Sequence, residues 1–431
     1  MIFGADAFTN QLRTVARLAS KPKNLAKFGG CNRKIYNKFG GLEDLIYFCG
    51  QVNELVNYMI QRQIESSLLQ DFGQGKVIVL LGARQVGKTT LIEALSRGVD
   101  SVLMLNCDDQ EDVMLLEDKS TTELRALLSP YQYVFIDEAQ RVRNIGLTIK
   151  KMADLKLPTQ VIVTGSSSLE LANDINEPAT GRTIEYRLYP LSLAELAQET
   201  SEREESRMLH QRLIYGCYPG VVTDTSRAKR TLAALANDYL YKDILSYKGI
   251  KKPDVLQKLV RALALQLGSE VSYNELSNLL GVDKETVENY IGLLEKCFIV
   301  FRLDSFSRNL RNEIRKGKKI YFYDNVVRNA VISNYAPPEL RTDMGPLWEN
   351  LMVSERVKRN MYCGSFAQLY FWRTHDQKEI DLIEEEDGMI RAFEFKWNPR
   401  TKSRVPQQFI KTYVPSGFTV ITPENFWDFV K

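Results

Sequence analysis

The stretch KVIVLLGARQVGKTTLI, residues 76–92, constrains the fold more than any other part of the sequence. An apolar, β-branched run leads into a loop bounded by Gly82 and Gly87, and Lys88 and Thr89 follow directly. This is the spacing of a P-loop, which joins a buried parallel strand to a helix. Its glycines let successive N–H groups converge on phosphates at the helix N-terminus. The alternative is an ordinary strand-to-helix turn.

The motif assigns roles to particular side chains. Lys88 is expected to reach the β and γ phosphates of a nucleoside triphosphate, and the Thr89 hydroxyl is expected to hold Mg²⁺. The sequence therefore predicts ATP and Mg²⁺ as cofactors. The predicted phosphate-binding residues of the loop are Gly82, Ala83, Arg84, Gln85, Val86, Gly87, Lys88, Thr89 and Thr90.

The composition bounds the class of protein. A chain of 431 residues with 44% apolar residues has room for about three domains with cores. The net charge of +3 means that a nucleic-acid surface would need local clustering of basic residues. Six cysteines without a C-x-x-C pair and only two histidines argue against zinc and for a reducing cytosol. No apolar run reaches the ~18 residues of a membrane span and no signal peptide follows Met1, so we expect a cytoplasmic protein without a membrane partner.

Residues 1–58 differ from the rest of the chain. They mix Gly, Asn and Lys without a sustained apolar period, so we expect a poorly ordered or non-core extension. The amphipathic stretch MIQRQIESSLLQDF, which begins at Met59, is the predicted start of the compact protein.

A second acidic motif follows the P-loop. The apolar residues 133–136 deliver Asp137 and Glu138 to the C-terminal end of a strand, the edge at which open α/β sheets bind ligands. Asp137 suits a Mg²⁺ contact through water, and Glu138 suits the base that orients the attacking water. The next strand, in TQVIVTGSSS, places Thr164 or Ser166 beside the γ-phosphate; the alternative is a plain strand before a Ser-capped helix.

Arg182 is a candidate for charge stabilisation. It follows a glycine in a loop before an alternating strand, where an arginine can stabilise charge that develops on the phosphates. The alternative is an ordinary solvated surface arginine.

Taken in order, several motifs resemble a known family. GARQVGKTT, VFIDEAQ, VIVTGSSS, TGR, YPLSLAEL and YGCYPGV are similar to bacterial and archaeal ATP-binding proteins of the AAA superfamily that carry a C-terminal domain of unknown function. The resemblance covers residues 59–431. It implies an ATPase domain, a winged-helix segment and a PD-(D/E)xK nuclease-like domain. Because AAA-type sites commonly form between subunits, it also implies a nucleotide-dependent homo-oligomer in which Arg182 or a nearby arginine acts across the interface.

The segment SYNELSNLLGVDKETVENYIGLLEKCFIVFRL has the pattern of a winged helix-turn-helix. It predicts a helix, a turn at Gly281, a second helix capped by Asp283, and a strand from Phe298 to Leu303. Basic residues follow in the position of a hairpin: Arg308, Arg311, Arg315, Lys316, Lys318 and Lys319. Such a wing could track DNA phosphates. The alternatives are a protein contact or a solvated charged face.

The last part of the chain carries the nuclease-like pattern. Asp381, Glu394 and Lys396 form D…E-x-K on two strands joined by Asp387-Gly388, a strong hairpin signal. Ile380 stands where the motif usually has proline. The helix MGPLWENLMVSERVKRN precedes the strands, with Leu347, Leu351 and Met352 expected to face inward and Glu349 or Glu355 available to the site.

A two-residue turn fixes the register of this hairpin. Asp381 is then opposite Glu394 and Glu379 opposite Lys396, while the buried face pairs Ile380 with Phe395 and Leu382 with Phe393. Carboxylates that face each other repel, so we predict a divalent metal on Glu349, Asp381 and Glu394. Lys396 would orient the nucleophile or stabilise charge on the scissile phosphate. The alternative is that Glu379 and Lys396 form a surface ion pair, while Asp381 and Glu394 are only solvated.

The sequence therefore predicts an α/β protein. Its parts are an AAA-type ATPase domain with a parallel sheet (59–227), a helical connection and winged helix (228–330) and a smaller restriction-endonuclease-like domain (331–431). The predicted function is ATP-driven action on DNA, with cleavage by the C-terminal domain and Mg²⁺. The alternative is a nucleotide-controlled DNA- or protein-binding switch with an inactive nuclease-like fold.

Overall fold

A computed structural model describes residues 60–97, 99–165, 181–223, 250, 252–307, 317–374 and 376–431. The chain divides into two units, residues 1–60 and residues 61–431, and the described helices and strands belong to the second. The extension expected over residues 1–58 lies outside the described residues. Within the described ranges, no helix combines the length and the apolar character needed to cross a membrane.

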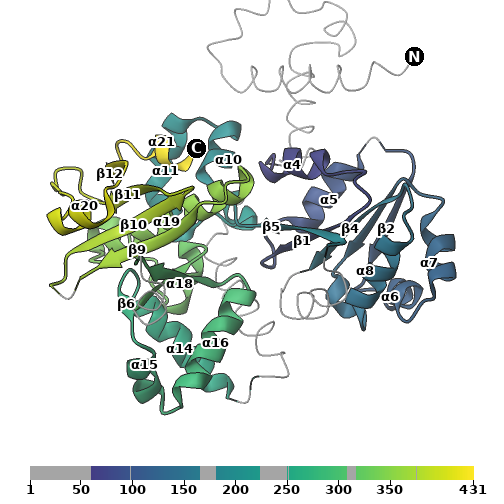
Figure 1. Cartoon of the computed structure of the whole chain (residues 1–431), viewed down its shortest axis with the longest axis horizontal. Helices are drawn as coiled ribbons and strands as arrows, with labels where there is room; N and C mark the ends of the chain where they lie inside the picture. Colours follow the sequence, from purple (N-terminus) through teal and green to yellow (C-terminus); the bar gives the residue numbers. More distant parts are fainter. Residues whose placement is uncertain are drawn as a thin grey trace, which may run out of the picture. The chain divides into compact units, whose positions relative to one another are not determined.

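The P-loop strand lies inside a five-stranded parallel sheet (Figure 1). β1 (Val77–Gly82) pairs with β4 (Gln160–Gly165) on one side and with β5 (Thr183–Leu188) on the other. β3 (Tyr133–Asp137) lies beyond β4, and β2 (Val102–Asn106) forms the edge. Every residue of β1 and β4 is buried, as expected for central strands of a parallel sheet. The predicted P-loop strand and acidic strand are confirmed.

Helices precede, connect and follow these strands along the chain. They are α4 (Ile64–Gln70), α5 (Lys88–Ser96), α6 (Gln110–Leu116), α7 (Thr121–Leu128), η2 (Ala139–Arg141), α8 (Ile145–Asp154), α10 (Leu193–Glu199), α11 (Glu202–Tyr215) and α12 (Pro219–Thr223). Capping boxes at Ser120 and Ser192 determine where α7 and α10 begin, because each serine and the glutamate three residues later satisfy each other's backbone N–H groups.

A second sheet contains the described strands that follow β5. Its order is β12-β11-β10-β9-β7-β8-β6. The strands are β6 (Glu270–Val271), β7 (Val300–Ser305), β8 (Lys318–Phe322), β9 (Gln368–Arg373), β10 (Glu379–Glu386), β11 (Met389–Phe395) and β12 (Gly417–Ile421). β7 pairs with β9 in parallel, so one hydrogen-bonded sheet crosses the boundary that the sequence predicted between residues 330 and 331.

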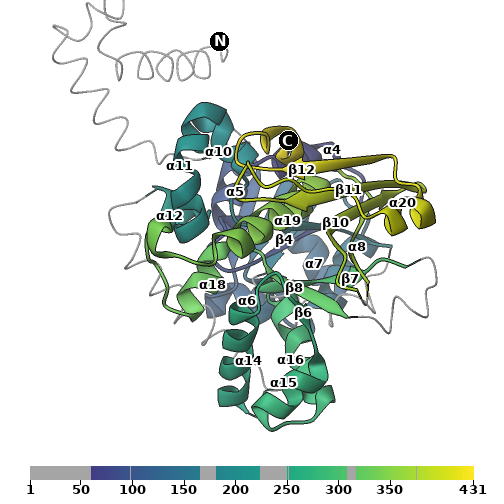
Figure 2. The ribbon, with the colours of Figure 1, turned by 90° about the vertical axis from the view of Figure 1, so that its left-hand side faces the viewer.

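Some helices of this part of the chain lie beside the second sheet, and others are gathered below its β6 edge in the view of Figure 2. Together they are α14 (Pro253–Leu265), α15 (Tyr273–Leu280), α16 (Lys284–Lys296), α18 (Asn325–Val331), η5 (Pro338–Leu340), α19 (Met344–Tyr362), α20 (Gln407–Tyr413) and α21 (Trp427–Val430). α20 packs Phe409 near Ala392, whereas α21 packs Phe429 against Phe393. Neighbouring strand residues point to opposite faces, so the two helices lie on opposite sides of β11. On α19, Leu347, Leu351 and Met352 are buried, as predicted.

The two helices predicted around Gly281 are confirmed. α15 ends at Gly281, which adopts a φ of 66° that suits glycine, and the Asp283 carboxylate caps α16 by accepting the Thr286 N–H at 2.7 Å. The strand predicted from Phe298 begins at Val300. A winged helix as a separate module remains a prediction, because its strands belong to the larger sheet.

The hairpin register is confirmed from Leu382 to Glu386, and Leu382 is opposite Phe393 as predicted. The prediction for Ile380 is wrong, since this side chain packs with Ile383 and Ala392 in the apolar cluster of α20. The reason is an irregularity between Ile380 and Ile383, where β10 has one residue more than its partner β9. Such a bulge turns the following side chains to the other face.

A side chain at position 82 is expected to disrupt the first sheet. A Cβ on Gly82 would lie 2.3 Å from the carbonyl oxygen of Leu188 in β5. Both residues belong to paired strands, so neither backbone can shift easily to relieve this contact. We expect Gly82→Ala to lower the free energy of unfolding by about 1–3 kcal/mol. Thermal unfolding measures the change, and Gly417→Ala in β12, where no atom lies within 4 Å of the added carbon and φ is not positive, controls for loss of a glycine. Equal stability of Gly82→Ala and wild type would contradict the close approach of β5.

Candidate functional site

The P-loop has the backbone that a phosphate cradle needs. Gln85 and Gly87 adopt left-handed φ values of 62° and 95° between β1 and α5. The side chains of Ala83 and Val86 are buried and anchor the loop, while Arg84 and Gln85 face outward. Left-handed residues within a loop turn successive N–H groups toward one point.

Lys88 is folded back over this loop. Its ammonium donates hydrogen bonds to the carbonyl oxygens of Gly82 and Ala83, at 2.9 Å each, and the residue is buried. Because α5 begins at Lys88, the ammonium adds its charge to the positive end of the helix. The loop and lysine together form an anion-binding arrangement.

The acidic motif meets the P-loop at the sheet edge. The Thr89 hydroxyl donates to Asp137 Oδ2 at 2.6 Å, and the Thr164 hydroxyl donates to the other Asp137 oxygen. The Glu138 N–H donates to the Thr164 hydroxyl at 3.3 Å. Of the two sensor candidates, Thr164 thus lies in the site, whereas Ser166 lies outside the described residues. A hydroxyl and a carboxylate side by side are the hard oxygen donors that Mg²⁺ prefers, so these residues fit the ion.

Glu138 is held in an uncommon backbone conformation. It adopts φ 52° and ψ 39°, and its carboxylate accepts a hydrogen bond from the Gln140 amide. A left-handed conformation costs a residue other than glycine about 1 kcal/mol, and such strain gathers at functional sites. The backbone therefore changes direction at Glu138, directly after β3 ends at Asp137.

Cys107, beside this motif, was not a candidate from sequence. Its N–H donates to the Asp137 carbonyl at 2.9 Å. Burial raises the pKa of the Cys107 thiol to about 12, and the carboxylates of Asp112 and Asp137 add to the rise. A thiol with so high a pKa is neutral at physiological pH, and a neutral thiol is a weak nucleophile.

The nuclease-like residues form a second polar cluster, which we call the carboxylate cluster: Lys319, Tyr321, Glu349, Glu379, Asp381, Glu394 and Lys396. Lys396 Nζ lies 2.6 Å from Glu394 and 3.7 Å from Asp381. Asp381 also accepts the Phe395 N–H at 2.8 Å. Glu349, rather than Glu355, belongs to this cluster, since Glu355 pairs with Lys358 instead.

Lys319 enters the carboxylate cluster from β8. It is fully buried, lies 2.9 Å from Glu349 and also pairs with Glu379. The expectation that Lys319 tracks phosphates from a wing is therefore wrong. Lys318 is also engaged, at 3.1 Å from Asp304. The remaining basic residues of that stretch, Arg308, Arg311, Arg315 and Lys316, lie outside the described residues.

The geometry of the carboxylate cluster does not favour a divalent metal. Among the described residues, no three His, Cys, Asp or Glu side chains are grouped so that they could hold an ion. The carboxylate repulsion that a metal was expected to relieve is relieved by Lys319 and Lys396. Burial lowers the pKa of Lys396, but Asp381 and Glu394 outweigh this and raise it, so the ammonium stays charged. The metal role of Glu349, Asp381 and Glu394 remains a prediction that this geometry does not favour.

Family models match three consecutive segments. Residues 74–197 match the AAA domain. The P-loop domain therefore has the AAA fold. Residues 206–337 and 344–426 match two domains of unknown function, DUF8612 and DUF4143. We call residues 74–197 the AAA domain.

Uncharacterized proteins from distant organisms are similar over most of the chain. One from Haemophilus influenzae is 24% identical over 335 residues, which cover 71% of this chain and 78% of that protein. The protein MJ1544 of Methanocaldococcus jannaschii is 23% identical over 404 residues, which cover 85% of this chain and 88% of that protein. The similarity thus extends well beyond the AAA domain.

Two solved structures are similar to this chain at lower sequence identity. The Walker-type ATPase PABY2304 of Pyrococcus abyssi has 18% identity and a TM-score of 0.44, with 64% of this chain and 96% of that chain covered. CDC6P from Pyrobaculum aerophilum has 14% identity and a TM-score of 0.26, with 65% and 93% covered. At these TM-scores neither likeness bears on function.

Arg182 lies far from the P-loop of its own AAA domain. Its carbonyl accepts the Val77 N–H at the start of β1, whereas the P-loop follows the end of that strand. Its guanidinium pairs with Asp154 at 2.6 Å. The prediction that Arg182 acts on phosphates at the P-loop of the same copy is therefore wrong, because Arg182 and the P-loop lie at opposite ends of β1. A role across an interface between two copies stays a proposal, and light scattering of the ATP-loaded protein tests for such an assembly.

The sequence did not point to Arg62 as part of the site. This residue precedes the segment that matches the AAA domain, yet its guanidinium donates to the carbonyl of Val86 inside the P-loop at 2.7 Å. Arg62 is distinguished only by its burial and by its several hydrogen-bond partners. Neither property can be recognised in the sequence, where Arg62 is a single basic residue before a helix. Arg62 is only 7% exposed.

The carboxylate cluster predicts a pH dependence of stability. Burial raises the pKa of Glu349 from 4.5 to about 7; Lys319 opposes the rise and Asp381 adds to it. Between these values the unfolded chain has lost the proton and the folded chain keeps it. The free energy of unfolding should therefore fall as pH rises through this window, by at most about 1.4 kcal/mol per pH unit.

Glu349→Gln isolates this contribution, because the amide does not titrate. Chemical denaturation of both proteins at about pH 5 and about pH 7 should give a steeper loss of stability for wild type. Equal loss in the two proteins would contradict the raised pKa of Glu349.

Proposed function

We propose that the AAA domain binds ATP with Mg²⁺ and hydrolyses it. The observation that carries the proposal is the 2.6 Å hydrogen bond between Thr89 Oγ1 and Asp137 Oδ2. It joins the first turn of α5 to the end of β3, and so brings together the two side chains that P-loop enzymes use to hold Mg²⁺. When bound, Mg²⁺ neutralises charge on the β and γ phosphates.

The remaining roles follow from position. The P-loop N–H groups and Lys88 hold the phosphates, and Glu138 accepts the proton of the attacking water, which its carboxylate orients for in-line attack. Thr164 keeps Asp137 and the backbone of Glu138 in fixed relation through its hydroxyl. Catalysis of this kind depends on positioning and on electrostatics, which a preorganised loop supplies.

Two substitutions of Thr89 test this proposal. Thr89→Val keeps the shape and removes the hydroxyl, so we expect Mg²⁺-dependent ATP turnover to fall by at least about tenfold, the loss that corresponds to ~1.4 kcal/mol. Thr89→Ser keeps the hydroxyl and should retain most of the turnover. Turnover that is equal in wild type and Thr89→Val would remove Thr89 from the site, and absence of ATP hydrolysis by wild type would overturn the proposal.

For the second sheet we propose a binding role controlled by the nucleotide rather than metal-dependent cleavage. The observation in favour is the partly buried pairing of Lys319 with Glu349 and of Lys396 with Glu394. Two ammonium groups already neutralise the carboxylates, so a divalent cation would have to displace them. Titration calorimetry with Mn²⁺ should give no binding that depends on Asp381, and binding lost in Asp381→Asn would restore the nuclease interpretation.

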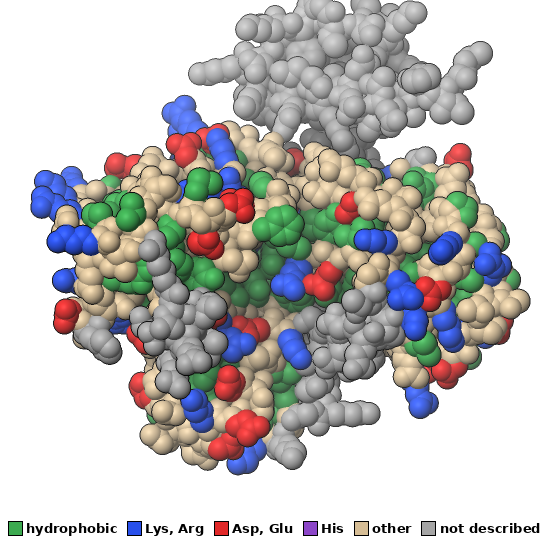
Figure 3. Space-filling view, viewed as in Figure 1, with side chains coloured by type: hydrophobic (Ala, Val, Ile, Leu, Met, Phe, Trp, Pro, Cys, Tyr) green, Lys and Arg blue, Asp and Glu red, His purple; other side chains and the backbone are tan. Residues whose placement is uncertain are grey.

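DNA is the partner that we propose for this switch, and the support is the basic run at residues 308–316 of the sequence. The exposed turns of α16 carry Glu285 and Glu288, which phosphates repel. On the face in Figure 3, Lys and Arg side chains are interspersed with Asp and Glu among the described residues. Contact through the basic run is therefore favoured over contact through α16.

DNA binding by the full-length protein tests this choice. Replacement of Arg311, Arg315 and Lys316 by serine should weaken binding to a fluorescent duplex. The slope of the logarithm of the binding constant against the logarithm of the salt concentration should become shallower by up to ~0.9 for each phosphate that the protein no longer neutralises. Lys284→Ser on α16 should change neither quantity. No binding by wild type at low salt, with or without ATP, would favour a protein partner instead.

A further inference from the structure

Arg62 makes four hydrogen bonds from one buried guanidinium. It donates to the P-loop carbonyl of Val86 at 2.7 Å and to the carbonyl of Tyr189 at 2.7 Å. It also donates to Glu195 at 3.0 Å and to the Tyr362 hydroxyl at 3.3 Å. One side chain thus joins the P-loop, the segment after β5, α10 and the end of α19.

The charge of Arg62 is matched inside the protein. Burial lowers its pKa, but Glu195 and Tyr362 outweigh this and raise it, so the guanidinium remains charged. Glu195 is completely buried and also accepts the N–H groups of Gln63 and Ser192. A planar guanidinium with its donors satisfied in this way holds a fixed orientation.

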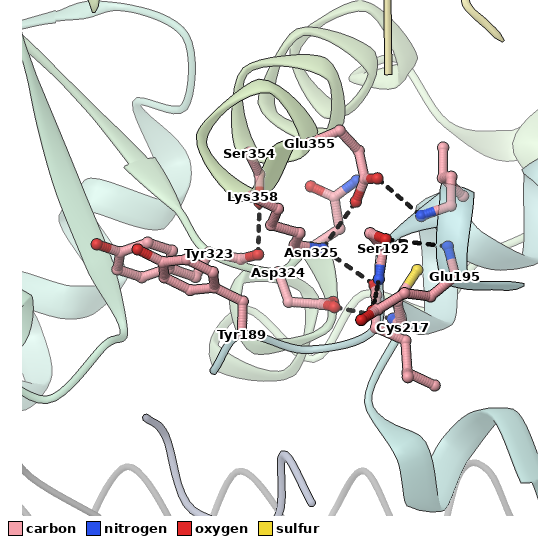
Figure 4. Close-up of polar contacts among 12 residues, drawn as sticks. Tyr189, Ser192, Glu195, Cys217, Tyr323, Asp324, Asn325, Ser354, Glu355 and Lys358 are labelled. Carbon is pink, nitrogen blue, oxygen red and sulfur yellow. Dashed lines mark hydrogen bonds and ion pairs between the residues drawn. The ribbon is translucent and has the colours of Figure 1, made fainter. Parts of the chain in front are cut away.

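α19 is attached to the same part of the AAA domain at three points. The Tyr362 hydroxyl accepts the Tyr189 N–H at 3.1 Å. Lys358 donates to the carbonyl of Leu191 at 3.1 Å, and Glu355 accepts the Leu193 N–H at 2.7 Å (Figure 4). In Figure 4, Glu355 and Lys358 point from one helix toward this segment. These three hydrogen bonds connect residues 189–193 directly to α19.

α19 also reaches the carboxylate cluster. Glu349, nearer to its N-terminus, contacts Lys319 and Tyr321 of β8. A helix rises 1.5 Å per residue, so Glu349 and Tyr362 lie roughly 20 Å apart along one rigid element. The same helix contacts Arg62 at one end and the second sheet at the other.

We propose that Arg62 is a positioning residue of the nucleotide site and that Tyr362 transmits nucleotide binding from Arg62 to α19. The inference deepens the proposed ATP binding and rests on it. A nucleotide that draws the P-loop N–H groups to its phosphates turns the peptide that carries the Val86 carbonyl. Arg62 follows that carbonyl, and its contact with Tyr362 then differs between the two states, as a coupling between sites requires.

The chain provides its own probe for this coupling. Its four tryptophans are Trp348, Trp372, Trp397 and Trp427, all outside the segment that matches the AAA domain. Trp348 lies on α19, is fully buried, and its ring centroid is 5.8 Å from that of Trp397. Selective excitation of tryptophan therefore reports on the second sheet and its helices, and not on the P-loop itself.

The experiment combines calorimetric ATP binding with tryptophan emission in the full chain. For wild type we expect ATP with Mg²⁺ to change the emission. Tyr362→Phe removes one hydroxyl, so it should bind ATP within about threefold of wild type yet lose at least about half of the emission change. Tyr335→Phe, the same substitution in the loop before η5, should keep the full change.

Arg62→Gln tests the positioning role, because it removes the charge that holds Val86. We expect the Kd for ATP to rise by about tenfold and the emission change to disappear. An unchanged Kd in a folded Arg62→Gln protein would overturn the positioning role, and a full emission change in Tyr362→Phe would overturn the transmission. ATP binding by wild type without any emission change would overturn the inference alone. Absence of ATP binding by wild type would overturn the proposed function as well.

Discussion

Lys88→Ala is expected to lower the affinity for ATP by about 100-fold, whereas Glu138→Gln should leave affinity unchanged and lower turnover by about 100-fold or more. The difference arises because Lys88 lies on the P-loop itself and Glu138 at the end of β3. The buried ammonium contributes charge-assisted hydrogen bonds to bound phosphates. The Glu138 carboxylate acts only on the attacking water, so its amide loses the base and keeps the binding site. Calorimetry measures the affinity, and phosphate release measures the turnover.

Matched controls separate these effects from general loss of charge. Lys76→Ala removes an exposed lysine just before β1, and Glu93→Gln removes an exposed carboxylate on α5. Both should retain wild-type affinity and turnover. Unchanged turnover in Glu138→Gln would exclude Glu138 as the base, and unchanged affinity in Lys88→Ala would exclude phosphate binding by this loop.

Glu384→Ala is expected to lower the free energy of unfolding by about 3–5 kcal/mol. Arg356 of α19 and Glu384 of β10 form a buried ion pair with distances of 2.9 and 2.6 Å. The Arg356 guanidinium also lies 4.7 Å from the ring centroid of Phe429. Removal of Glu384 leaves a buried positive charge without its carboxylate partner, and the low dielectric makes that charge costly. Chemical denaturation measures the loss.

A double substitution tests the reason for this loss. Arg356→Met with Glu384→Leu replaces both charges by apolar side chains of similar volume, so much of the stability lost in Glu384→Ala should return. Lys119→Ala, which breaks a partly exposed ion pair with Glu123, should cost less than about 1 kcal/mol. If the double variant is as unstable as Glu384→Ala, poorer packing rather than an unpaired charge is the cause.

Local sequence was sufficient for the P-loop and the acidic motif. Gly82, Gly87, Lys88 and Thr89 lie within one strand-loop-helix unit, and spacing alone puts their groups together. Asp137 follows a buried strand, and parallel strands deliver their C-terminal residues to one edge. The hairpin register from Leu382 to Glu386 was predictable for the same reason, since a two-residue turn leaves one pairing.

Several features depended on contacts between distant segments. Arg182 follows a glycine as expected, but its distance from the P-loop depends on where β5 pairs with β1. Lys319 belongs to a basic run in the sequence, yet the pairing of β8 inside the second sheet buries it against Glu349. The bulge in β10 also moved Ile380, because the irregularity arises against β9 rather than across the hairpin.

The sequence by itself determined the parts of this protein whose groups are neighbours along the chain or at the ends of parallel strands. Those parts are the P-loop, the acidic motif, the two helices around Gly281 and the hairpin. Only the tertiary structure decided that one sheet joins β7 to β9, that Arg62 holds Val86, and that lysines neutralise the carboxylate cluster. The physical reason is that burial and charge pairing depend on which surfaces meet, and hydrophobic periodicity identifies a buried face without naming its partner.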